Sequence, residues 1–362
     1  MIQHVTIVGT GLIGGSLALA WQNAVPDVQL TGFDTPDVLD AAHARGAVDI
    51  RAASLEAAVA EAELVVLAAP LRAMLPLLND MAPHLPAGVV VTDVGSVKRP
   101  VLAHAAEALP AHATFIGGHP MAGSENDGID AADPLLFENA TYVLCPPEDT
   151  EVPAALRTLI EATGARIRLM DAATHDRVAA TVSHLPQLVA VALARYAGER
   201  HATDGATLDL AAGGFRDLTR IASSPFGLWR DILTANQGPV LDALGGFAAA
   251  IQTLRNRLIA EDHEALAAVF DDAHEARATI PERGKGFLEP LADVYVRAQD
   301  RPGELVTLTT ALAEASLNIK EIELLRVREG TDGTFRLSFS DLPTAEQAAA
   351  VLDDAGFSTV LP

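Results

Sequence analysis

The chain has 362 residues, of which 49% are hydrophobic, and this length supports two or three domains that each bury a core. A formal net charge of -23 and only 4% aromatic residues argue against nucleic acid as a partner, because phosphates require basic patches and exposed bases require stacking rings. A lone cysteine, Cys145, excludes an intramolecular disulfide framework and favours a reducing cytoplasm, and no uninterrupted run of eighteen apolar residues predicts insertion into a membrane.

Residues 1–148 alternate short apolar runs with amphipathic segments. The runs are rich in β-branched residues, as is typical of parallel strands that are buried on both faces. They lie at His4–Val8, Gln29–Phe33, Leu64–Ala68, Val89–Val94, Thr114–Gly117 and Thr141–Cys145. Strands that alternate with helices predict a doubly wound α/β sheet, so we expect residues 1–148 to form a Rossmann-type nucleotide-binding domain.

Residues 149–284 carry Ala, Leu and charged residues at helical spacing, most clearly in Ala172–Arg200, Pro239–Ala260 and Asp262–Thr279. We therefore predict an all-helical middle domain for the substrate. It ends at Pro281–Gly286, which combines proline, glycine and charge as linkers do. Long Ala/Leu-rich helices often exceed what one subunit can cover, so this domain also predicts a homodimer.

Residues 290–362 follow a third pattern. Strand-like alternation and helical spacing succeed each other at Asp293–Ala298, Gly303–Ala315, Asn318–Val327, Thr334–Ser340, Thr344–Ala355 and Phe357–Leu361. The order is βαββαβ, which predicts a ferredoxin-like domain.

A glycine-rich loop follows the first predicted strand. It reads Gly9-Thr10-Gly11-Leu12-Ile13-Gly14, and an amphipathic segment follows it. The glycines allow a tight turn, close approach to a pyrophosphate and close packing of helix on strand, while Asp34 at the end of the next strand can bind the ribose hydroxyls. Asp34 would repel a ribose 2'-phosphate, so the pattern predicts NAD rather than NADP, with no metal. The alternative is an ordinary glycine-rich turn with a solvent-facing aspartate.

Three polar, glycine-containing clusters lie downstream, at Thr92–Lys98, Gly117–Glu125 and Gly213–Ala222. The first two directly follow predicted strands, at the carboxyl edge where α/β sheets bind their ligands. His119 is the one side chain of its cluster that titrates near neutral pH, as a general base for an alcohol oxidation requires. An isolated histidine is more often structural, and an arginine such as Arg220 is more often a surface residue.

Four phrases in the same order resemble the prephenate dehydrogenase family of tyrosine biosynthesis. They are Thr-Asp-Val-Gly-Ser-Val-Lys at 92–98, Gly-His-Pro-Met-Ala-Gly-Ser-Glu at 118–125, Val-Ser-His-Leu-Pro at 182–186 and Gly-Gly-Phe-Arg-Asp-Leu-Thr-Arg-Ile-Ala at 213–222. The resemblance implies an NAD-dependent oxidative decarboxylation of a small-molecule substrate, prephenate, to 4-hydroxyphenylpyruvate. Hydride would leave the ring carbon that carries the hydroxyl, and loss of carbon dioxide would aromatise the ring.

The resemblance also implies roles for particular residues. His119 would accept the hydroxyl proton, Ser96 would orient that hydroxyl beside the cofactor, and Arg220 would hold a substrate carboxylate. Ser124 and His184 would complete the pocket, with His175-Asp176 near its mouth. An arginine that pairs with a carboxylate through two hydrogen bonds fits a protein whose net charge otherwise repels anions.

One position departs from the family pattern. Many members carry a second histidine after His-Leu-Pro, where this chain has Gln187, which can hydrogen-bond a substrate but cannot titrate near neutral pH. An arogenate or dual-specificity cyclohexadienyl dehydrogenase therefore stays the nearest alternative. A β-hydroxyacid dehydrogenase usually relies on a lysine in its helical part, and residues 150–260 contain none. A non-catalytic NAD or amino-acid sensor would not need Ser96, His119 and Arg220 together.

The C-terminal segment resembles the small-molecule-sensing ACT domain in its turn at Asp300–Glu304 and in Ser316–Ile319. The resemblance implies an amino-acid effector, for which tyrosine as end product is the natural hypothesis. Its candidate contacts are Asp300, Gly303, Asn318 and Ile319. The alternative is a dimerisation module without a ligand.

Overall fold

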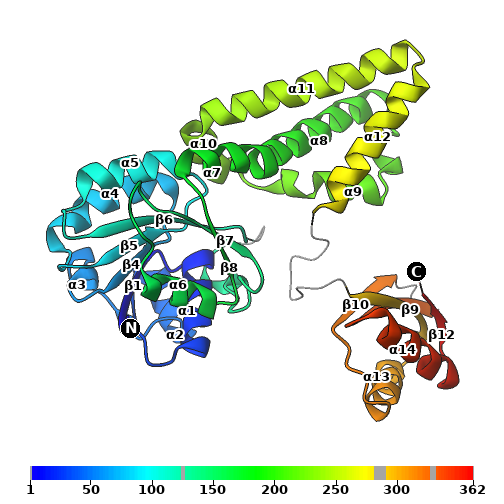
Figure 1. Cartoon of the computed structure of the whole chain (residues 1–362), viewed down its shortest axis with the longest axis horizontal. Coiled ribbons are helices and arrows are strands. Elements are labelled where there is room, and N and C mark those ends of the chain that lie inside the picture. Colours follow the sequence, from blue (N-terminus) through cyan, green and yellow to red (C-terminus); the bar gives the residue numbers. More distant parts are fainter. Residues whose placement is uncertain (1, 124–126, 281–290, 327–331, 362) are drawn as a thin grey trace. The chain divides into compact units, whose positions relative to one another are not determined.

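A sheet of eight strands runs through residues 4–169 of the computed structural model (Figure 1). Its strand order is β3-β2-β1-β4-β5-β6-β7-β8. The strands are β1 (His4–Val8), β2 (Gln29–Phe33), β3 (Ile50–Arg51), β4 (Leu64–Leu67), β5 (Val90–Asp93), β6 (Thr114–Pro120), β7 (Thr141–Cys145) and β8 (Arg166–Leu169). Neighbouring strands are parallel except for β6 and β7, which are antiparallel. The structure describes residues 2–123, 127–280, 291–326 and 332–361.

Helices cover both faces of this sheet. They are α1 (Leu12–Ala24), α2 (Pro36–Ala44), α3 (Leu55–Val59), α4 (Leu71–Met81), α5 (Arg99–Ala108) and α6 (Ala154–Ala162). Alternate residues of β4 show the two layers, because Leu64 and Val66 join the core under α1, α2 and α6 while Val65 and Leu67 join the core under α3, α4 and α5. This burial on both faces explains the continuous apolar strands, and the expected Rossmann-type sheet is confirmed.

Three details correct the expectations from sequence. The sheet runs past the expected boundary at residue 148, because β8 pairs with β7 and α6 packs on α1. Hydrogen bonding to β7 extends β6 to Pro120, so His119 lies within a strand and not in a loop after it. The strands β3 and β8 were not predicted, since β3 has two residues and β8 alternates arginine with apolar residues.

The segment after the sheet is helical, as expected. Its elements are α7 (Ala172–Ala179), the π-helical turn η3 (Ala180–His184), α8 (Leu185–Asp204), η4 (Leu208–Leu210), α9 (Gly213–Thr219), η5 (Arg220–Ser223), α10 (Phe226–Ala235), α11 (Gln237–Ile259) and α12 (His263–Ala278). The long helices α8 and α11 contact each other (Figure 1). Residues 1–275 form one compact unit with the sheet.

Much apolar surface of these helices stays exposed in the single chain. Apolar residues of these helices that are at least half exposed are Val182, Tyr196, Leu210, Leu218, Phe226, Leu228, Leu241, Ile251, Leu258, Ile259 and Phe270. The continuous helical run Ala172–Asp204 is long and apolar enough to cross a membrane, with a mean hydropathy of 1.3, and 28% of that window is buried. One such helix is weak evidence for a membrane span, and exposed patches of this size equally mark protein interfaces.

The second compact unit begins at Ala276. It contains a sheet of four strands in the order β10-β11-β9-β12, in which neighbouring strands are antiparallel. Its elements are β9 (Ala292–Gln299), α13 (Glu304–Glu314), β10 (Glu321–Arg326), β11 (Asp332–Phe339), α14 (Leu342–Asp354) and β12 (Ser358–Val360). Val294, Val296 and Ala298 of β9 pack with residues of both helices, so one face of the sheet is covered. This is the ferredoxin-like βαββαβ layout. The expected linker Pro281–Gly286 lies outside the described residues.

Candidate active site

The loop between β1 and α1 has the shape that a dinucleotide requires. Gly9 has a φ of +99°, and a Cβ there would lie 2.6 Å from the backbone of Ala68, which directly follows β4. A Cβ at Gly14 would lie 1.9 Å from the carbonyl oxygen of Gly9, whereas one at Gly11 would meet nothing within 4 Å. Gly9 and Gly14 are therefore demanded by the fold itself, while Gly11 leaves open space at the start of α1.

The start of α1 carries no acidic residue and no side-chain cap, so its first amide groups remain available to an anion. Leu12 and Ile13 form its first turn. Asp34 follows β2 and is held in place by the backbone N–H of Thr10, which donates to its Oδ2 at 2.7 Å. The open space at Gly11, the free helix terminus and the fixed carboxylate together fit the pyrophosphate and ribose of NAD.

A buried ion pair joins the loop after β5 to β6. The ammonium of Lys98 contacts the carboxylate of Asp93 and donates to the carbonyl of Gly118 at 2.6 Å, and neither charged side chain is exposed. Asp93 also accepts the backbone N–H of Gly118 at 3.0 Å. Ser96 is half-buried and lies along the chain between Asp93 and Lys98, whose side chains are both bonded to the strand that carries His119.

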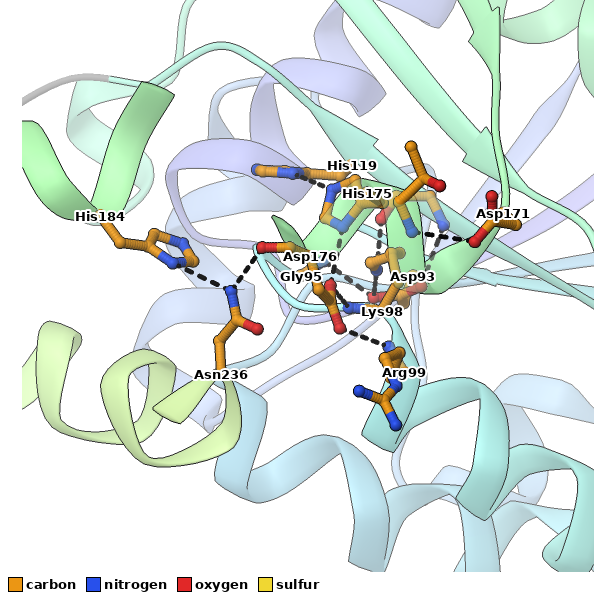
Figure 2. Close-up of polar contacts among 12 residues, drawn as sticks. Asp93, Gly95, Lys98, Arg99, His119, Asp171, His175, Asp176, His184 and Asn236 are labelled. Atoms are coloured by element: carbon orange, nitrogen blue, oxygen red, sulfur yellow. Dashed lines mark hydrogen bonds and ion pairs between the residues drawn. The ribbon is translucent and has the colours of Figure 1, made fainter. Parts of the chain in front are cut away.

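His119 is the first member of a buried chain of polar groups (Figure 2). Its Nδ1 lies 2.8 Å from Nε2 of His175 on α7, and Nδ1 of His175 lies 2.8 Å from Oδ1 of Asp176. Burial lowers the pKa of His119 well below its ordinary value, and the positive charge of Lys98 lowers it further. His119 is therefore neutral at physiological pH, which is the state that a general base needs.

Asp176 ties this chain of groups to the surrounding elements. Its carboxylate accepts the backbone N–H of Lys98 at 2.7 Å and that of Arg99 at 3.0 Å, at the start of α5. Its backbone carbonyl accepts Nδ2 of Asn236 at 2.8 Å, and the same Nδ2 lies 3.2 Å from Nδ1 of His184 (Figure 2). The starts of α5 and α11 are thus both bonded to Asp176 on α7.

His184 ends the π-helical turn η3 and is buried. Its burial lowers its pKa to about 4, so the imidazole is neutral. Its Nε2 is buried without a hydrogen-bond partner among the described residues, and so is Nε1 of Trp229, whose ring packs edge-on at 6.0 Å. Two unsatisfied polar atoms side by side indicate a place where a ligand or water completes the hydrogen bonds.

Arg220 and Gln187 lie in the helical part. Arg220 begins η5 and is exposed in the single chain. Gln187 on α8 is buried, and its amide donates to the backbone carbonyl of Ile221 at 2.9 Å. Gln187 therefore holds the segment that carries Arg220. Ser124 lies outside the described residues.

Several residues at this site were not singled out from the sequence. Asp93 and Lys98 belong to the segment 92–98 that carries the family resemblance, but nothing in the sequence marked them as a fully buried pair. A lysine that follows a strand-ending aspartate by five residues is the available signal. Asn236 gave no signal, because its partners His184 and Asp176 come from distant parts of the chain.

The proposed effector residues lie on either side of α13 along the chain. Gly303 precedes α13 with a φ of +90°, and Asp300 lies before it, whereas Asn318 and Ile319 follow the other end of that helix. A helix of 11 residues spans about 16 Å. The length of this helix thus lies between the two pairs along the chain.

Two family models match consecutive parts of the chain. Residues 17–169 match the model of the prephenate dehydrogenase nucleotide-binding domain, and residues 171–272 match the prephenate dehydrogenase dimerization domain. The chain belongs to the prephenate dehydrogenase family. It is therefore an oxidoreductase with an NAD-binding domain, as the sequence predicts. The first family model ends at the close of β8, in agreement with the extent of the sheet.

Individual relatives cover most of the chain. A prephenate dehydrogenase of Bacillus subtilis is 37% identical over 96% of this chain and 95% of its own length. A cyclohexadienyl dehydrogenase of Zymomonas mobilis is 36% identical over 77% of this chain and 97% of its own. The structure of Aquifex aeolicus prephenate dehydrogenase with hydroxyphenyl propionate and NAD+ is similar at a TM-score of 0.72 and 29% identity, covering 78% of this chain and 99% of the other.

Proposed function

We propose that this enzyme oxidises and decarboxylates prephenate, with His119 as the general base. The observation that supports this most directly is the buried, neutral His119, whose Nδ1 is engaged by His175 and whose Nε2 is therefore the nitrogen left to meet a substrate. A base of this kind takes up a hydroxyl proton while hydride leaves the same carbon, so that no protonated ketone forms.

The reaction balances without a further reagent. NAD held at the loop Gly9–Gly14 and Asp34 would supply the acceptor for the hydride of the ring carbon that bears the hydroxyl. His119 holds the hydroxyl proton while the bond to the ring carboxylate breaks and its electron pair aromatises the ring. The same proton then returns to the phenolate oxygen. Ser96, which lies along the chain between Asp93 and Lys98, orients the hydroxyl, and Arg220 binds a carboxylate through two hydrogen bonds.

Two variants test these roles. His119→Asn removes the proton acceptor, and we expect kcat to fall by at least about 10²-fold, the size of a general-base contribution, with NAD affinity unchanged. Arg220→Ala removes a binding group, and we expect chiefly a higher KM. Steady-state kinetics and NAD titrations measure both. Turnover of His119→Asn close to that of the parent enzyme would exclude the base assignment.

Gln187 is the reason to assay arogenate beside prephenate. Its amide donates to the backbone carbonyl of Ile221, and it is a neutral side chain that does not titrate. The two substrates differ by a keto group against an ammonium group, and the neutral Gln187 carries no negative charge that would attract the ammonium. We propose prephenate as the preferred substrate, and a higher kcat/KM for arogenate in parallel assays would reverse that preference.

A homodimer through the helical part, in the cytoplasm, is the state we propose for the working enzyme. The exposed apolar side chains of α8, α10, α11 and α12 support an interface, because monomers rarely expose so much apolar surface, and the single buried Cys145 suits a reducing compartment. Sedimentation equilibrium measures the mass. A monomer at micromolar concentration would contradict the proposal, and Phe270→Asp should shift the equilibrium toward monomer.

The C-terminal unit is proposed as an ACT-like module that binds tyrosine between two copies. The separation of Asp300 and Gly303 from Asn318 and Ile319 by the length of α13 supports a site shared by two units. Gly303→Ala should weaken inhibition by tyrosine without lowering activity. Gly356→Ala is the matched control, because Gly356 also has a φ of +90° and open space around its Cβ position. Inhibition that both variants retain, and that competes with prephenate, would assign tyrosine to the active site.

A further inference from the structure

The buried groups behind His119 form a continuous line from a strand to a helix terminus. His119, His175 and Asp176 are 7%, 2% and 1% exposed, and both links between them measure 2.8 Å. The two imidazole rings meet edge to face at 71°, which points a nitrogen of one ring at the other (Figure 2). None of this is needed to bury a histidine, since one backbone carbonyl would satisfy Nδ1.

The bonds of Asp176 fix the proton positions along the whole line. Its carboxylate accepts two backbone N–H groups, from Lys98 and Arg99, and it must therefore be an acceptor toward His175 as well. Nδ1 of His175 then carries a proton, and Nε2 of neutral His175 is an acceptor. Nδ1 of His119 must be the donor to it, so the lone pair of His119 lies on Nε2.

We propose that His175 and Asp176 act as a proton store for His119. When Nε2 of His119 takes the substrate hydroxyl proton, its Nδ1 proton moves to Nε2 of His175, and the positive charge comes to rest beside the carboxylate of Asp176. The two protons move back when the phenolate oxygen is reprotonated. His175 is thus a positioning and proton-holding residue that does not touch the substrate, and its role rests on the proposed function of His119.

The surrounding charges favour the charge on His175 over His119. Burial and the positive charge of Lys98 both disfavour a positive charge on His119. The carboxylate of Asp93, which accepts the backbone N–H of Gly118 next to His119, is committed to Lys98 and to two backbone N–H groups. Among the described residues, Asp176 is the carboxylate that contacts the pair of His119 and His175, and its contact is with His175. A proton on the pair is therefore most stable at the inner histidine.

His175→Gln separates proton storage from mere orientation. A glutamine amide oxygen can accept the hydrogen bond from Nδ1 of His119 but cannot take its proton. We expect kcat to fall by about 10²-fold with KM for prephenate and affinity for NAD little changed. The acid limb of the kcat/KM profile should move to lower pH, because His119 must then carry the charge alone. His104→Gln is the control, since His104 on α5 contacts Asn79 and lies outside this line.

Each result decides between the possibilities. A fall in kcat without movement of the acid limb would show that His175 only orients His119, and would overturn the proposal. A kcat within about threefold of the parent, which is a change of less than about 1 kcal/mol in activation free energy, would overturn it too. An enzyme that is inactive on prephenate and arogenate before mutation would instead refute the proposed function. Nitrogen-15 NMR of histidine-labelled parent enzyme is independent of any variant, and protonation of His119 at Nε2 in the neutral state would also overturn the proposal.

Discussion

Lys98 and Asp93 form an ion pair in which both side chains are fully buried, directly behind the strand that carries His119. Removing one partner of such a pair leaves the other as an uncompensated buried charge, which costs about 3–5 kcal/mol. We expect Lys98→Met to lower the free energy of unfolding by that amount in urea titrations, because the carboxylate of Asp93 loses its ammonium.

Arg51→Met is the matched control for that experiment. Arg51 pairs with Asp40 at the surface, where both side chains are more than half exposed, and such pairs contribute less than about 1 kcal/mol. If the two variants lose a similar free energy of unfolding, the buried pair contributes no more to stability than the surface pair. A Lys98→Met enzyme that remains folded should also show a higher acid limb in its kcat/KM profile, since Lys98 lowers the pKa of His119.

Gly11 and Gly14 lie in one loop but should respond differently to alanine. A Cβ at Gly14 would overlap the carbonyl oxygen of Gly9, so Gly14→Ala should destabilise the fold. A Cβ at Gly11 meets no protein atom, so Gly11→Ala should keep its melting temperature and bind NAD at least about tenfold more weakly, or 1.4 kcal/mol. Thermal melts and NAD titrations of both variants test this, and unchanged NAD affinity in Gly11→Ala would show that the cofactor does not use that space.

Gln187 should act on substrate affinity through Arg220. Its amide holds the carbonyl of Ile221, the residue that follows Arg220, so Gln187→Leu should free that segment and raise the KM for prephenate while kcat changes little. Gln22→Leu provides the comparison, because Gln22 hydrogen-bonds Asp49 on the surface of the sheet domain. A loss of kcat at constant KM would instead indicate that Gln187 contributes in the transition state.

The sequence predicts most of the sheet because its information is local. Strands β1, β2 and β7 have the predicted bounds, since each is a short apolar run between turn residues. The end of β6 was missed because its last residues, Gly118 to Pro120, are ordered by pairing with β7 from further along the chain. The same limit applies to the site. His119 stands out by its chemistry, whereas its link to His175 exists only after α7 packs against β6.

His184 and His119 should make the protein sensitive to acid. Both are buried and neutral in the folded chain, and burial lowers the pKa of His184 to about 4. In the unfolded chain a histidine takes up its proton at about pH 6.5. Between those values the unfolded chain binds protons that the folded chain does not, so the free energy of unfolding should fall as the pH drops from about 6.5 to about 4. Thermal melts of His184→Gln across that range should show a shallower fall than the parent, whereas His104→Gln should not. Equal slopes for all three proteins would mean that His184 gains its proton in the folded state as readily as in the unfolded one, and that its burial does not control its charge.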